Sequence, residues 1–287
     1  MKKALINGLG ILLATFSGSW AQRPSNNQYT SNDTLTKSVE YPVRPYKISH
    51  AEPLYMDLVR DLGARRGERE WNIGTELSQH NGAMNWHPFI EYEFAPVNRL
   101  GLEVELPVQA TVPTQDQALQ VPASLQLHSV KTSIQWTFAV LKRWQTSLAV
   151  GYTNELIIRP AGHTGTLFLS ERGHPFLVAA KRWGSHWHTL LYAAWGGELP
   201  KQGPIRPSGR ELNLAVHYAF PRSKAFIGIE VYQFWNGPEH EQVARPQVRI
   251  ALKDNLLVGL VGSLDLQQPG SYSSFVRLIY EPRKRQH

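Results

Sequence analysis

The 287-residue chain contains no cysteine, so it forms no disulfide bond and cannot hold zinc or an iron–sulfur cluster through thiolates. It also lacks long apolar runs: after Gly74 none exceeds about nine residues, whereas a membrane-spanning helix needs about 20. Apolar residues nevertheless make up 42% of the chain, too large a share for a disordered protein. These absences leave a folded chain that depends on neither disulfides nor spanning helices.

The first residues are typical of a secretory signal. Lys2 and Lys3 precede an apolar run that ends at Phe16, and Ser19 and Ala21 place small residues before a cleavage site. The run is too short for a membrane anchor. We therefore predict a signal peptide over residues 1–21.

Export has consequences for partners and for the next segment. An exported protein is a poor partner for nucleic acid, despite its formal net charge of +7. Residues 22–49 are rich in Ser, Asn, Thr and Gln and show almost no apolar periodicity. We predict that they form a flexible lead segment.

From residue 70 onward the dominant pattern is alternation of apolar and polar residues. For example, Leu102 and Val104 alternate with Glu103 and Glu105. Such alternation is typical of strands with one apolar and one polar face, and several segments have the roughly 9–11 residues of a membrane-crossing strand. Twelve segments fit: 70–78, 84–95, 100–110, 126–141, 144–157, 174–183, 187–197, 211–220, 225–236, 245–253, 256–266 and 273–281.

The connections between these segments alternate between short and long. Outer-membrane barrels have tight turns at one end and longer loops at the other, and tryptophans near both strand ends fit two membrane interfaces. We predict an all-β fold, a transmembrane antiparallel up-and-down β-barrel of about 12 strands over residues 70–283. The connections predicted to be long are 79–83, 112–124, 158–173, 198–210, 237–244 and 267–272.

Alternation places a charged set of side chains in the lumen. A hairpin centred near Asn98 puts Glu93 opposite Glu103 and Glu91 opposite Glu105, and like charges across a ladder are destabilising. Compensation is expected from cationic side chains (Arg249, Arg277 or Lys131), from bound cations, or from raised carboxyl pKa values. The candidate lumen or solute residues are Glu91, Glu93, Glu103, Glu105, Arg249 and Arg277.

Two interpretations of this lumen remain open. One is a structural ion-pair network that fills a narrow barrel. The other is a cation-attracting constriction or a ring that binds a solute. The pair His186-x-His188 is interpreted as surface or interfacial histidine, because no third metal ligand stands at a telling distance.

Residues 50–74 resemble a known family. The segment His50-Ala51-Glu52-Pro53-Leu54-Tyr55-Met56-Asp57 resembles the motif of the HAEPLID-type family of Bacteroidetes exported proteins, with Tyr55-Met56 where the name has a single Ile. The wider resemblance is to barrels labelled as transporters of the meta-pathway of phenol degradation. It implies an outer-membrane barrel and supplies no catalytic residues.

The same segment has a different apolar pattern from that of the strands that follow it. Its leucines, Leu54, Leu58 and Leu62, recur at helical spacing and favour a short helix from Pro53 to Leu62 within a charged periplasmic motif, residues 50–69. Two roles remain open: a plug or partner-docking element, and a solvated cap whose charges pair among themselves. The motif residues singled out are His50, Glu52, Asp57, Arg60, Asp61 and Arg65.

These observations predict an outer-membrane protein that passes or binds a small solute through a charged lumen. The alternative is a non-conducting structural or partner-docking barrel that uses residues 50–70. An enzyme is not expected, because His80-Asn81-Gly82 does not match the catalytic motif of outer-membrane phospholipases. The expected partners are outer-membrane lipid, a small solute and a periplasmic or outer-membrane protein; no cofactor is expected.

Overall fold

The computed structural model describes residues 45–56, 58–80, 83–112, 124–159, 167–200, 204–267 and 272–282. Residues Val43–His287 form one compact unit, separate from Met1–Pro42. The predicted signal peptide and residues 22–44 of the lead segment lie outside the described residues. Within the described residues, no helix has the length and apolarity of a membrane span.

The described residues contain thirteen strands and one short 3-10 helix. The strands are β1 (Arg69–His80), β2 (Ala83–Val97), β3 (Leu100–Val112), β4 (Ser124–Leu127), β5 (Ser129–Leu141), β6 (Thr146–Ile158), β7 (Phe168–Trp183), β8 (Trp187–Pro200), β9 (Arg206–Ala219), β10 (Phe226–Asn236), β11 (Glu239–Lys253), β12 (Leu256–Asp265) and β13 (Tyr272–Tyr280), and the 3-10 helix is η1 (Lys142–Trp144).

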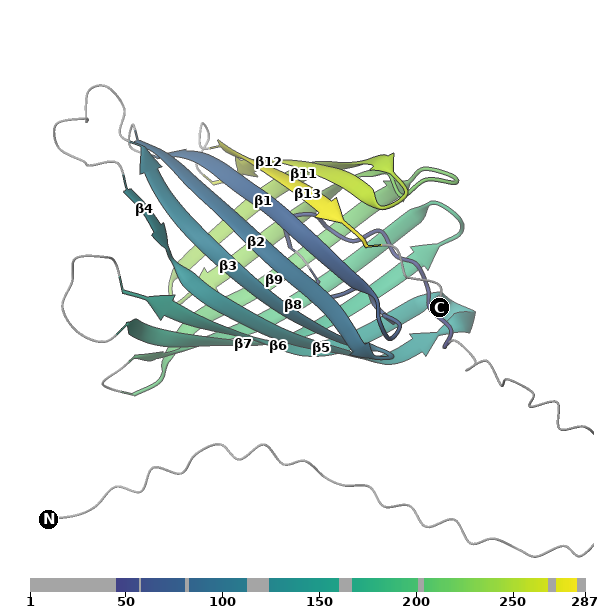
Figure 1. The fold of residues 1–287 in the computed structure, drawn as a ribbon, viewed down its shortest axis with the longest axis horizontal. Coiled ribbons are helices and arrows are strands. Elements are labelled where there is room, and N and C mark those ends of the chain that lie inside the picture. The colour runs from purple at the N-terminus through teal and green to yellow at the C-terminus, as the bar shows by residue number, and fades with distance from the viewer. Residues whose placement is uncertain are drawn as a thin grey trace, which may run out of the picture. The chain divides into compact units, whose positions relative to one another are not determined.

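The strands form a closed antiparallel barrel (Figure 1). Neighbours in sequence pair with each other, and β1 pairs with both β2 and β13, which closes the sheet. β4 and β5 occupy one position, because β3 pairs with β4 near Thr111 and with β5 near Gly101. The barrel therefore has twelve strand positions, and the predicted fold is confirmed.

The two ends of the barrel differ, although less than the sequence suggested. At the turn end, the connections are 98–99, 142–145, 184–186, 220–225 and 254–255. At the loop end, two connections that were predicted to be long are short, so those two predictions are wrong. β1 ends at His80 and β2 begins at Ala83, and only Gly237-Pro238 joins β10 to β11. The last residues of β1 and the first residues of β11 are all polar in sequence, which hides the alternation.

The outer wall is apolar and the inner wall is polar or small. On β5, Ser133, Gln135 and Thr137 are buried, whereas their neighbours Ile134 and Trp136 are exposed. Lipid offers no hydrogen-bond partner, so only a closed sheet can expose such a surface to it. The pattern is that of a barrel whose outward face meets hydrocarbon.

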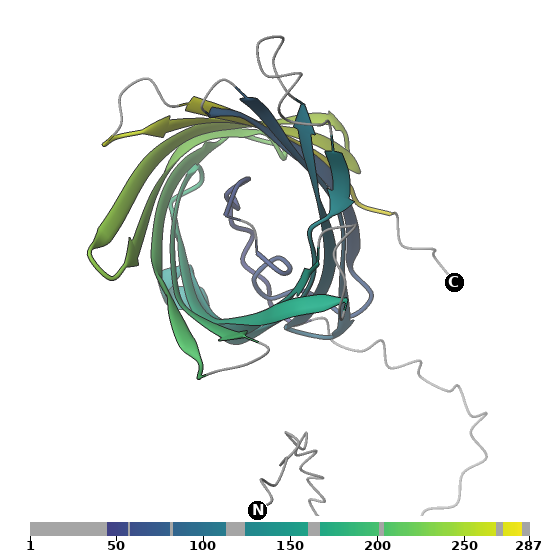
Figure 2. The ribbon, with the colours of Figure 1, turned by 90° about the vertical axis from the view of Figure 1, so that its left-hand side faces the viewer.

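A non-strand segment lies inside the barrel. Residues 46–56 and 58–68, which we call the plug, lie within the ring of strands (Figure 2, the purple segment), at the end of the barrel where β1 begins (Figure 1). Their aliphatic side chains are almost completely buried: Ile48, Leu54 and Leu62 are each 1% exposed and Leu58 is 2% exposed. The plug therefore fills the lumen on the turn-end side.

Small inward residues on the wall make room for the plug. One plug cluster (Met56, Leu58, Val59 and Leu62) packs on alanines of four strands, Ala149, Ala180, Ala194 and Ala215. Gly101 and Gly259 face the plug where it approaches most closely. A Cβ at Gly101 would lie 2.5 Å from the Arg60 Cβ, and one at Gly259 would lie 2.6 Å from Leu54 Cδ2.

We predict that Gly101→Ala loosens the plug and leaves the barrel intact. The added methyl overlaps the stem of Arg60, and overpacking of this kind costs about 1–3 kcal/mol. Limited trypsin digestion of the folded protein should then cleave faster at the plug arginines. Gly262→Ala is the control, because its Cβ would meet only Pro246 Cγ at 3.8 Å. Equal cleavage rates in both variants would contradict the prediction.

Candidate functional site

Side chains of the barrel wall hold the backbone of the plug on both of its arms, and close to β1 the plug also bonds to the backbone of Ala95 and Arg99. Amide groups of Ala51, Leu54 and Met56 donate to His188 Nδ1 (3.1 Å), Gln247 Oε1 (2.6 Å) and Glu230 Oε2 (3.3 Å), respectively. On the returning arm, Gly63 N–H donates to Thr137 Oγ1 at 2.9 Å, and Gln135 Nε2 donates to the carbonyl of Arg60 at 2.5 Å. Strands all around the barrel therefore hold one irregular segment.

The helix predicted from Pro53 to Leu62 is wrong. The described residues of that range form bends and turns, and their amides bond to the wall instead of to carbonyls four residues earlier. Leu54 packs with Phe226 and Phe275 on one wall, whereas Leu58 and Leu62 pack with Phe176 on another. The leucine spacing serves two walls of a tube and not one face of a helix.

Ion pairs hold the plug arms together and to the wall. Arg60, 4% exposed, contacts Glu70 at 2.7 Å and Glu93 at 3.0 Å. Lys47 pairs with Asp61 and, at 3.0 Å, with Glu68. Because one partner of Arg60 is the lumen residue Glu93, the plug is part of the electrostatics of the wall.

Glu52 and Asp61, on opposite arms of the plug, share a proton. Burial, reinforced by the charge of Asp61, raises the pKa of Glu52 well above its usual range. Burial alone would also raise the pKa of Asp61, but Lys47, Arg60 and a hydrogen bond from Glu52 hold it well below its usual range. Of the two carboxyl groups, Glu52 therefore holds the proton more tightly and donates the hydrogen bond to Asp61.

His50 and His188 meet where the plug enters the barrel. His50 Nε2 lies 2.9 Å from Ser147 Oγ, and the two imidazole centroids are 6.3 Å apart. Burial, together with His188 and Arg182, lowers the pKa of His50 to about 3. The interpretation of His188 as surface or interfacial histidine is wrong, because its side chain is 5% exposed and accepts a plug amide.

Tyr55 marks the tip of the plug. Its hydroxyl donates to Glu76 Oε2 at 2.9 Å, and the Arg245 guanidinium lies 3.6 Å from the centre of its ring. Arg245 also stacks on Tyr232 and pairs with Glu230 at 3.0 Å. Tyr55 thus links β1 to β11, which are three positions apart around the barrel.

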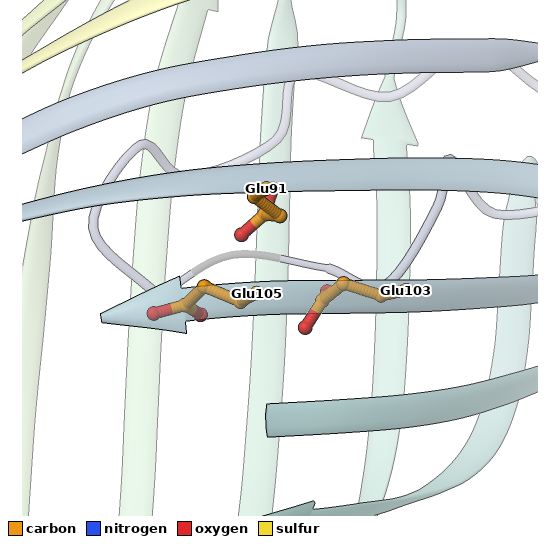
Figure 3. A group of neighbouring side chains, drawn as sticks. All are labelled: Glu91, Glu103 and Glu105. Atoms are coloured by element: carbon orange, nitrogen blue, oxygen red, sulfur yellow. The ribbon is translucent and has the colours of Figure 1, made fainter. Parts of the chain in front are cut away.

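The predicted pairing of like charges on β2 and β3 is confirmed. Glu91 lies opposite Glu105, and Glu93 lies opposite Glu103. Carboxylate oxygens of Glu91, Glu103 and Glu105 come within 4.8 Å of one another, which is the one such group of possible metal ligands within the described residues (Figure 3). Like charges this close require compensation.

Protein groups provide that compensation. Lys131 contacts Glu105 at 3.1 Å, Arg277 lies 3.6 Å from Glu91, and Asn72 donates to Glu91 at 2.7 Å. Arg249 does not join the group, because its Nε donates to the carbonyl of Lys224 at the turn end. The third cation is instead the plug residue Arg60, which pairs with Glu93.

Above the plug the lumen opens into two cavities that share Tyr55 and Glu76. The larger, of about 470 Å³, contains the acidic group and the aromatic residues Phe89, Phe176 and Tyr192. The smaller, of about 310 Å³, adds Glu241, Asp265 and Arg245 from the neighbouring strands β11 and β12. Together they form an acidic vestibule on the loop-end side of the plug.

Most of the candidate residues lie in the lumen or the plug, as predicted from the sequence, but several residues that hold the plug were not among the candidates. Of the motif residues, His50, Glu52, Arg60, Asp61 and Arg65 lie in the plug, and Asp57 lies outside the described residues. The plug anchors Arg245 and Gln247 were missed, as was Asn72, which donates to Glu91 and Glu93, although their inward positions on alternating strands were a usable signal. Lys47 and Tyr55 carried no such signal.

The comparisons with known proteins agree with this architecture. A family model described as HAEPLYID-like matches residues 46–281, from the plug to the last strand. The chain belongs to the HAEPLYID-like family. Read in one-letter code, the family name spells residues 50–57 with Met56 in place of Ile. The resemblance seen in the sequence is confirmed, with the correction that Tyr55 belongs to the name.

Solved structures share the fold of this HAEPLYID-like protein at low identity. An outer-membrane channel from Pseudomonas putida F1 superposes with a TM-score of 0.58 at 10% identity, covering 77% of this chain and 98% of that one. The NanC porin superposes with a TM-score of 0.52 at 7% identity, covering 74% of this chain and 100% of that one. These likenesses show the barrel fold. A comparison with curated proteins finds no match.

We predict that Arg60→Met releases the plug. The change removes a cation from Glu93, which is 2% exposed, and breaking a buried ion pair costs about 3–5 kcal/mol. Hydrogen exchange followed by mass spectrometry should show lost protection at residues 54–64. In the double variant with Glu93→Gln, no carboxylate charge is left at position 93, so part of the protection should return. A double variant as unprotected as Arg60→Met would contradict this account.

Proposed function

We propose that this protein is an outer-membrane channel closed by its own plug, and that its vestibule admits small cationic solutes. The apolar outer wall and the tryptophans near both ends support insertion in a membrane. The export signal predicted at residues 1–21 and the fold shared with outer-membrane channels and porins support the location.

The observation that carries the proposal is a segment of the chain inside a membrane-type barrel. Plug side chains reach opposite walls of the lumen, so no solute passes that level while the plug is in place. Passage then requires the plug to move toward the turn end. The contacts that hold it are hydrogen bonds to the wall, the buried ion pair of Arg60 with Glu93, and two apolar clusters.

The charge of the vestibule supports a cationic solute. Carboxylates outnumber ammonium and guanidinium groups in the two cavities: Glu76, Glu91, Glu103, Glu105, Glu155, Glu211, Glu241 and Asp265 against Lys131, Arg245 and Arg277. A lumen with one sign of charge in low-dielectric walls concentrates counter-ions. Aromatic faces such as those of Phe176 and Tyr192, which stack at 5.2 Å, add favourable surface for a cation.

A permanently closed structural barrel is the second candidate. It is favoured by how completely the plug is anchored, through hydrogen bonds to β5, β8, β10 and β11 and through two apolar clusters. In that reading the acidic group and its cations only fill and stiffen the lumen. One experiment separates the two candidates.

The experiment locks the plug to the wall with Leu54→Cys/Gly259→Cys. A Cβ at position 259 lies 3.2 Å from Leu54 Cγ, close to disulfide geometry, and the chain has no other cysteine. In planar bilayers, the reduced protein should show discrete channel openings. Oxidation should abolish them, and a reductant should restore them.

Each single-cysteine variant serves as a control and should ignore the oxidant. A further variant without residues 46–66, checked for folding by its heat-dependent gel mobility, should conduct continuously. Identical currents in the oxidised and reduced double variant would refute gating by the plug. Silence from a folded barrel without the plug would establish the structural candidate.

We also predict that Glu103→Gln/Glu105→Gln weakens cation selectivity. Both side chains border the larger cavity, and their neutralisation removes two of its negative charges. In a salt gradient across the open channel, the cation-to-anion permeability ratio should fall toward unity while the conductance changes little. Glu171→Gln, an exposed position on β7, is the control. An unchanged ratio would exclude the acidic group as the selectivity element.

A further inference from the structure

Four outward side chains form a row across β8, β9, β10 and β11 near the loop end. Trp195 lies directly opposite Arg210, Arg210 opposite Trp235, and Trp235 opposite His240. Their chain neighbours Ala194 and Glu211 face the lumen, so alternation puts the row on the outer wall. A guanidinium thus stands between two indoles on the surface that faces lipid.

The row borders a hollow of about 790 Å³ in the outer wall. Trp195 and Trp235 form its sides, Arg210 lies between them, and Ala193 and Leu212 line it below. The small residues Ala193 and Gly237 leave the space open. Trp195 is 46% exposed, so the indole is available to a ligand from outside.

No side chain that the structure describes pairs with the guanidinium of Arg210, and no carboxylate belongs to the row. Glu211 also borders the hollow, but its carboxylate accepts a hydrogen bond from Asn213 Nδ2 and lines the larger lumen cavity. His240 stacks on Trp235 with centroids 5.0 Å apart and planes at 6°, and its Nδ1 lies 3.1 Å from Gln267 Nε2. If the Gln267 amide donates to Nδ1, the other ring nitrogen is free to donate outward.

These features match an anionic amphiphile. A guanidinium binds phosphate through two parallel N–H donors, and indoles prefer the headgroup layer. Below the row, toward the middle of the wall, exposed Leu191 and Leu214 continue the apolar surface along β8 and β9. A lipid whose headgroup binds Arg210 would therefore place its acyl chains against Leu191 and Leu214.

We propose that this hollow binds a phosphate-bearing lipid of the outer leaflet, with the phosphate on Arg210 between Trp195 and Trp235. The inference rests on the outer-membrane location under the proposed function, but not on conduction. A lipid held there would fix the height of the loop end in the membrane. It would also fill the hollow that the small residues Ala193 and Gly237 leave open.

Native mass spectrometry of the full folded protein in neutral detergent tests this inference. The probes are diphosphoryl lipid A, the same lipid without its phosphates, and inorganic phosphate. The protein should retain one phosphorylated lipid, and Arg210→Gln should weaken its binding about tenfold, as loss of a charge-assisted contact does. Arg143→Gln, an exposed arginine in η1 at the turn end, is the matched control and should bind like the unaltered protein.

Three results would overturn the proposal: equal lipid binding by Arg210→Gln, equal binding of the lipid without phosphates, or displacement of the lipid by millimolar inorganic phosphate alone. A Trp195→Ala variant, which keeps the charge and removes one wall, should also release the lipid faster. Bilayer recordings of Arg210→Gln separate this inference from the proposed function. The currents of Arg210→Gln should equal those of the unaltered protein. If both proteins are silent, the proposed function fails but the result on lipid binding remains valid.

Discussion

The inner face of the barrel cannot carry its carboxylates unaided, and the arrangement of the lumen depends on that constraint. β2 and β3 set two pairs of glutamates directly against each other across the ladder. Lys131 and Arg277 supply cations from other strands, and Arg60 supplies one from the plug. The charges of the plug and of the wall therefore compensate one another. If the plug left the lumen, water would have to take the place of Arg60 beside Glu93.

The barrel could be predicted from the sequence because its rules are local. Alternation assigns each residue to a face, and a tight turn fixes the register of the strands beside it, as it did for Glu91 and Glu105. The prediction failed where both faces of a strand are polar. The start of β11, with Glu239, His240 and Glu241, resembles a loop in composition yet continues the ladder beyond the apolar wall.

The plug could not be predicted because its partners are remote in sequence. Leu54 bonds to Gln247 and Met56 to Glu230, pairs separated by 193 and 174 positions. Leucines at helical spacing favour a helix only when one face is buried, and here one wall buries Leu54 whereas another buries Leu58 and Leu62. Nothing in the local pattern distinguishes a segment with one apolar face from a segment enclosed by a tube.

The plug begins and ends at the same mouth of the barrel. The Tyr46 ring lies beneath the Lys142 ammonium of η1, and the returning arm reaches β1 at Arg69 beside the same turns. Topologically it is a loop pushed into a tube and not a thread drawn through one. The seam between β1 and β13 joins the first and last strands, so the tube closes only when the whole chain is available. No plug residue belongs to that seam, so a plug that left the lumen would break none of the backbone hydrogen bonds between β1 and β13.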